Sequence, residues 1–139
     1  MFTAKVYNVM VGSLSGTMEE VYLAKEAIHK WNQQHAERMG KLFMPVEWTI
    51  KKEDIQHADL IIGIVGNWID NTIFIEDIIK LGKHVSLFIS AKQDPLNTIP
   101  SELKIVQSFI KKVCAQCYCN YYGGTSQLID CLNEQLVVF

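Results

Sequence analysis

The run DLIIGIV, residues 59–65, constrains the fold of this chain more than any other segment. After its first residue it contains no polar side chain that could face water on one side of a sheet. Uniformly apolar runs of this length are typical of central parallel strands, because helices cover both faces of a parallel sheet. We therefore expect a parallel sheet with a layer of helices on each side.

The rest of the chain alternates between strand-like and helix-like segments. Apolar residues at spacings of three and four predict a helix from Thr17 to about Met39, with a capping box formed by Thr17 and Glu20 and a stop at Gly40. Further helices are predicted at 72–81, around 103–113 and after the GGT turn at 123–125, and further strands at 5–12, 42–48, 84–90 and within VCAQCYCNYY at 113–122.

Strands that alternate with helices favour a parallel sheet, because each right-handed crossover packs its helix against the sheet. We predict an α/β three-layer sandwich of the Rossmann-like, flavodoxin-like kind, with a five-stranded parallel sheet in the order 2-1-3-4-5. The proline within 42–48 suggests that the second strand lies at an edge. Residues 1–139 are expected to form a single domain.

Composition argues against several classes of function. The net charge of −2 and the isolated lysine pairs at 51–52 and 111–112 do not form the basic patch that nucleic-acid binding needs. Neither a membrane-spanning apolar window nor a signal peptide is recognisable, so we expect a cytoplasmic protein that does not insert into membranes.

The four cysteines are then expected to be reduced, buried or edge thiols, because disulfides are rare in the cytosol. Cys114 and Cys117 form a single C-x2-C pair, whereas zinc ribbons usually have two such pairs. In an extended strand, Cys117 and Cys119 would face one side and Cys114 the other. The four histidines show no metal-ligand spacing, so no metal is predicted.

Ligands of such sheets bind outside the carboxyl ends of the strands, where the strand order reverses. In the predicted order this crevice lies between the first and third strands, where two loops meet.

The first loop leads into the N-terminus of a helix, which favours anions, and its candidate ligand-binding residues are Gly12, Ser13, Ser15, Gly16 and Thr17. The second loop supplies Asn67, Trp68 and Asp70, which suit a base or a sugar hydroxyl. The first loop matches neither a P-loop nor a dinucleotide fingerprint, and ordinary turn chemistry is the alternative explanation for its small residues.

Glu76 lies one turn into the helix after the third strand, within an otherwise almost wholly apolar run. If its carboxylate faces the crevice, partial burial raises its pKa and suits it to acid–base or charge-stabilising chemistry. The alternative is that Glu76 points to solvent and serves only the electrostatics of its helix.

These residues resemble those of a known family. The stretch VMVGSLSGTMEEVYLAKEAIHKWNQQHAERMGKLFMPVEW resembles the start of bacterial TIR-like domains, which begin with a strand, a small-residue turn, two acidic residues and a helix ending in AIHxWN. The stretch ADLIIGIVGNWIDNTIFIEDIIKLGKHVSLFIS is similar to their second half, and CYCNYYGGTSQLIDCLNEQL to their last strand and helix. The wider group includes nucleoside deoxyribosyltransferases.

The resemblance implies a nucleotide N-glycosidase, of the NAD glycohydrolase type, acting in stress or antiphage defence. It assigns Glu76 as the catalytic carboxylate, NAD or a related nucleotide as the substrate, and no further cofactor. A carboxylate beneath the ribose stabilises the oxocarbenium character that develops as the bond to the base breaks. The alternative is a module that binds a nucleotide, or assembles with its own copies, without catalysis. The connection between the second and third strands is short, about ten residues, and NTIF precedes the glutamate where relatives have SGT or DxGT.

Overall fold

A computed structural model describes residues 1–14, 18–46, 48, 52–66, 72–91 and 100–139. The elements follow the predicted alternation: β1 (Lys5–Ser13), α1 (Met18–Met39), β2 (Lys41–Val46), α2 (Lys52–Gln56), β3 (Leu60–Val65), α3 (Thr72–Lys80), β4 (His84–Ser90), α4 (Pro100–Val113), β5 (Tyr118–Tyr122) and α5 (Thr125–Val138). Of these described helices, none is both long and apolar enough to cross a membrane.

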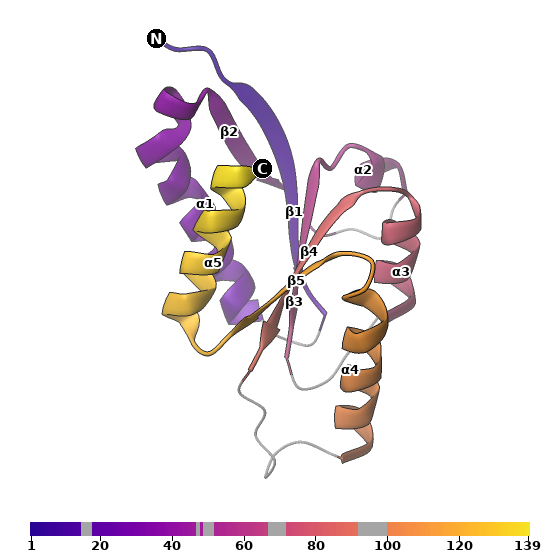
Figure 1. Cartoon of the computed structure of the whole chain (residues 1–139). Helices are drawn as coiled ribbons and strands as arrows, with labels where there is room; N and C mark the ends of the chain where they lie inside the picture. Colours follow the sequence, from indigo (N-terminus) through magenta and orange to yellow (C-terminus); the bar gives the residue numbers. More distant parts are fainter. Residues whose placement is uncertain (15–17, 47, 49–51, 67–71, 92–99) are drawn as a thin grey trace.

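The five strands form one parallel sheet in the order β2-β1-β3-β4-β5, as predicted. Figure 1 shows α1 and α5 on one face of this sheet and α2, α3 and α4 on the other. The chain is therefore a three-layer α/β sandwich of the Rossmann-like kind, and the prediction of fold class and strand order is confirmed.

β3 lies at the centre of the sheet, and all six of its residues are buried. Its alternate side chains belong to two separate cores. Leu60, Ile62 and Ile64 pack with α1 and α5, whereas Ile61 and Val65 pack with residues of α2, α3 and α4. The interpretation of 59–65 as a central strand covered on both faces is thus confirmed.

The largest differences from the predicted boundaries are in β2 and β5. β2 ends at Val46, two residues early, so that Trp48 lies beyond the strand. The connection between β2 and β3 is short, as expected, and contains the five-residue helix α2. β5 begins only at Tyr118, because the apolar stripe of α4 continues to the buried Val113 and a turn takes up the residues between them. The prediction of a strand running through Cys114 and Cys117 is therefore wrong.

Asn32 connects α1 to the edge strand β2. Its side-chain amide donates to the backbone oxygen of Phe43 at 2.7 Å and accepts from the backbone nitrogen of the same residue at 2.9 Å. The ring of Phe43 is fully buried and lies edge-on to Trp31, with 5.0 Å between the ring centroids. The amide thus satisfies both backbone groups of a core residue on a strand that has a sheet neighbour on one side only.

We expect Asn32→Ala to lower the free energy of unfolding by about 1–3 kcal/mol, because it leaves two backbone groups of Phe43 without their partner. Urea unfolding followed by circular dichroism measures the change. Gln33→Ala, at an exposed position of the same helix, is the matched control and is expected to change the free energy by less than about 0.5 kcal/mol. Equal losses in the two variants would contradict this role of Asn32.

Candidate functional site

The predicted crevice lies at the carboxyl ends of β1 and β3, where two glycines face each other. Gly12 of β1 is in register with Gly63 of β3, and the pairing of the strands continues to the backbone hydrogen bond from Leu14 N to Ile64 O, at 2.9 Å. Side chains alternate along a strand, so both glycines face the same side as Met10 and Ile61, towards α2, α3 and α4.

Large side chains fill the space that these glycines leave. A β-carbon at Gly12 would overlap the indole of Trp48, and one at Gly63 would lie 2.9 Å from a methyl group of Leu87 and 3.4 Å from one of Leu14. Trp48 is half-buried and packs against the core on this face. On the α2 side, the floor of the crevice is therefore closed by Trp48.

Only some of the predicted ligand-binding residues can be placed. Gly12 and Ser13 are the last two residues of β1, and Ser13 is in register with Ile64. The predicted ligand-binding residues that lie outside the described residues are Ser15, Gly16, Thr17, Asn67, Trp68 and Asp70.

Glu76 faces α4. Its carboxylate accepts a hydrogen bond from Lys112 Nζ at 3.1 Å and forms an ion pair with it, and its side chain is 25 % exposed. Together with Lys104, Ser108 and Phe109, the pair lines a groove of about 340 Å³ between α3 and α4. Lys112 belongs to the last turn of α4, at the end far from the carboxyl edge of the sheet. The structure thus brings Glu76 together with Lys112 and not with Gly12 or Ser13.

A second polar group, which the sequence did not indicate, lies at the carboxyl ends of β4 and β5. Tyr122 is buried, and its pKa is raised to about 12, first by burial and then by the negative charge of Glu20, while a side-chain hydrogen bond with Ser90 acts in the opposite direction. Tyr122 therefore stays protonated at neutral pH. These residues are far apart in the sequence, and no local pattern predicts their proximity.

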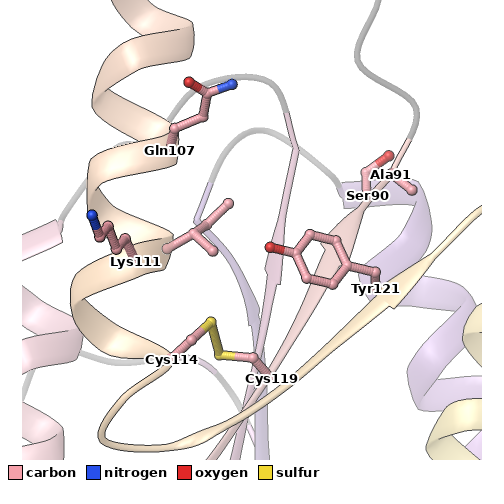
Figure 2. Close-up of a pocket in the computed structure, with 8 residues that line it drawn as sticks. Ser90, Ala91, Gln107, Lys111, Cys114, Cys119 and Tyr121 are labelled. Atoms are coloured by element: carbon pink, nitrogen blue, oxygen red, sulfur yellow. A yellow bond between two sulfur atoms is a disulfide. The ribbon is translucent and has the colours of Figure 1, made fainter.

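A larger cavity, of about 750 Å³, lies between α4 and the β4–β5 edge of the sheet (Figure 2). One wall is a disulfide between Cys114, just after α4, and Cys119 in β5, whose α-carbons are 5.6 Å apart. The expectation that both are reduced thiols is therefore wrong, and so is the expectation that they face opposite sides of a strand. Cys117 and Cys131 are free thiols.

Within the part of the chain that the structure describes, no three His, Cys, Asp or Glu side chains are grouped as a metal site would require. Burial raises the pKa of the Cys117 thiol to about 11, and the pKa of Cys131 is also raised, by burial and by Glu134 and Asp130. Both are protonated at neutral pH, so neither has the thiolate character of a nucleophilic cysteine.

We expect Gly12→Ala to destabilise the protein by about 1–3 kcal/mol, because the added methyl group overlaps the Trp48 ring. Thermal unfolding measures the loss. Gly124→Ala is the control for the added methyl group, since a β-carbon there meets nothing within 4 Å; because Gly124 is the N-cap of α5, this change is expected to cost up to about 1 kcal/mol. In a double-mutant cycle, Gly12→Ala is expected to cost clearly less when Trp48→Ala is already present; an unchanged cost would contradict the contact.

The raised pKa of Tyr122 predicts that the folded protein loses stability at alkaline pH. Its pKa is about 12 in the folded chain and about 10 when unfolded, so its contribution is complete below about pH 10 and is lost as the pH rises towards 12. We expect the free energy of unfolding of Tyr122→Phe to fall by about 1 kcal/mol less than that of the wild type between about pH 9 and about pH 11. Tyr22→Phe, at an exposed position of α1, is expected to follow the wild-type curve. Parallel curves for all three proteins would refute the prediction.

Comparison with known proteins gives information about the fold but not about the functional site. No protein-family model matches this sequence, and no curated protein matches it. Among solved structures, translation elongation factor SelB from Methanococcus maripaludis is similar over 98% of this chain and 36% of its own, with a TM-score of 0.61 and 11% identity. Homoserine dehydrogenase from S. aureus is similar over 86% of this chain and 33% of its own, with a TM-score of 0.51 and 13% identity.

The chain thus spans about a third of the length of these two proteins. At such low identity the similarity extends to the arrangement of strands and helices alone. What the comparisons support is a Rossmann-like α/β fold.

Proposed function

We propose that this chain is a TIR-like nucleotide-binding module that takes its ligand at the carboxyl ends of β1 and β3. The observation that supports this is the strand order, which makes β1 and β3 neighbours and sends their crossovers to opposite faces of the sheet. Open α/β sheets bind ligands at such a reversal. β1 ends there in Gly12 and Ser13, and α1 starts close by, at Met18.

The charges around α1 favour the sugar of a nucleotide over its phosphates at this helix. Glu19 and Glu20 lie in the first turn of α1, so their carboxylates offset the positive end of the helix dipole. Carboxylates repel phosphate and accept hydrogen bonds from hydroxyl groups. We therefore infer that ribose hydroxyls face α1 and that the phosphates lie farther from it.

The contacts of Glu76 favour binding without turnover. Cleavage of the N-glycosidic bond, which the resemblance implies, requires a carboxylate directly beneath the ribose. Lys112 instead holds the Glu76 carboxylate in the groove between α3 and α4. A hydrolase that uses Glu76 would first have to break this ion pair and turn the side chain towards β3.

Isothermal titration of the full chain with NAD, ADP-ribose and adenosine tests the proposal. We expect saturable binding, and we expect Ser15→Trp, a bulky substitution at a residue that the sequence predicts to bind the ligand, to weaken it at least about tenfold. Ser108→Trp is the matched control, because Ser108 lines the groove beside Glu76. Weakening by Ser108→Trp alone, or no binding of any of the three compounds, would refute the proposed site.

Chromatography of the same mixtures separates binding from catalysis. We expect NAD to remain intact over hours, and Glu76→Gln to leave the affinity within about twofold of the wild type. Release of nicotinamide by the wild type and its loss in Glu76→Gln would instead establish the N-glycosidase and exclude a binding-only module.

A further inference from the structure

The Cys114–Cys119 disulfide forms part of the wall of the cavity beside α4. Cys114 and Cys119 both line it, both are half-buried, and their disulfide closes its lower end as drawn in Figure 2. Tyr121 projects from β5 towards α4 above the disulfide, and Ser90 lies at the opposite end. A molecule in this cavity therefore lies against the S–S bond itself.

The cavity also has charge and hydrogen-bonding groups. Of the eight described residues that line it, Lys111 is the charged one, and Gln107 and Tyr121 add an amide and a phenol hydroxyl group. Lys112, the next residue, points away from the cavity and is paired with Glu76 of α3. A volume of about 750 Å³ lies within the range of small-molecule sites. These features suit a small anionic molecule.

We propose that this cavity is a thiol–disulfide exchange site for a low-molecular-weight thiol that carries a carboxylate or another anionic group. Lys111 attracts the anionic group, and the thiolate of the bound molecule attacks Cys119 Sγ. This site is independent of the proposed nucleotide site, because none of its residues belongs to β1, β3 or α1.

The exchange proceeds in two balanced steps. In the first, the new bond forms between the thiol sulfur and Cys119, the Cys114–Cys119 bond breaks, and its electron pair leaves on Cys114, which takes a proton from water. In the second, another thiol molecule attacks the mixed disulfide and leaves Cys119 as a thiol. Two thiol molecules become one small disulfide, and the protein gains two electrons and two protons. The reverse reaction, with the small disulfide as oxidant, restores the cross-link.

Lys111 makes Cys114 the better leaving group of the two. Lys111 and Cys114 are three positions apart at the end of α4, so they lie on the same face of the helix. A positive charge there stabilises the departing Cys114 thiolate. The free thiol of Cys117 lies 3.9 Å from Cys119 Sγ, and because burial raises its pKa to about 11 it stays protonated and does not compete as a nucleophile.

Differential alkylation of the full chain tests the disulfide itself. Purified protein is unfolded in iodoacetamide, then reduced and treated with N-ethylmaleimide, and the fragment after Lys112, which contains all four cysteines, is sequenced by mass spectrometry. We expect iodoacetamide on Cys117 and Cys131 and N-ethylmaleimide on Cys114 and Cys119. Iodoacetamide on all four cysteines would overturn the proposal.

The rate of reduction tests the selectivity of the cavity. Reduced glutathione, which is anionic, and cysteamine, which is cationic, are compared as reductants of the wild type and of Lys111→Gln. We expect the variant to react about three- to tenfold more slowly with glutathione and at an unchanged or higher rate with cysteamine. Comparing the two proteins for each thiol cancels the intrinsic reactivity of that thiol.

Lys104→Gln is the matched control, because Lys104 lies on the same helix but lines the α3–α4 groove. It is expected to leave both rates within about twofold of the wild type. Equal effects of the two lysine variants, or equal effects of Lys111→Gln on both thiols, would overturn the proposed site.

The reactivity of the two free thiols tests which sulfur is the leaving group. In Cys119→Ser, oxidised glutathione is expected to label Cys114 at least about threefold faster than it labels Cys119 in Cys114→Ser, because Lys111 stabilises the Cys114 thiolate. The opposite preference would overturn the assignment of Cys114 as the leaving group and of Cys119 as the attacked sulfur.

Discussion

The burial of β3 on both faces is the constraint on which the rest of the structure depends. A strand with no solvent-exposed face needs a hydrogen-bonded strand on each side of it and a layer of helices above and below. Here β1 and β4 are the neighbouring strands of β3. Helices α1 and α5 form one layer, and α2, α3 and α4 form the other. β2 and β5 are then the outermost strands, and the reversal of strand order falls between β1 and β3.

That same packing decides how much room is left at the reversal. Two glycines in register could open a hollow between β1 and β3, but Trp48, Leu14 and Leu87 occupy the space on the α2 side. A ligand in the crevice therefore has to lie at its rim, beyond the last residues of the strands. In the proposed function, the acidic first turn of α1 is therefore expected to contribute more to the choice of ligand than the floor of the crevice.

The sequence predicted the fold well because hydrophobic periodicity is a local signal. The uniform run at 59–65 indicates a strand that is buried on both faces, and the three-and-four spacing of α1 indicates a helix that is buried on one face. Neither inference needs to know which residues cover those faces. The partners of Glu76 and Cys114 are different in kind. Glu76 pairs with Lys112, 36 positions away. Cys114 forms a disulfide with Cys119 in β5, a strand that begins later in the sequence than predicted. Such contacts depend on how α4 sits on the sheet, which no local pattern records.

The last turn of α4 shows why that placement matters. Lys111 and Lys112 are successive residues, and successive residues of a helix point about 100° apart. One lysine therefore lines the cavity with the disulfide, while the other crosses to α3 and holds Glu76. A rotation of α4 by about 100° would move one lysine into the place of the other, so that either the cavity would lose its positive charge or Glu76 would lose its ion pair. The register of one amphipathic helix, set by Val106, Ile110 and Val113 in the core, thus determines the electrostatics of both grooves.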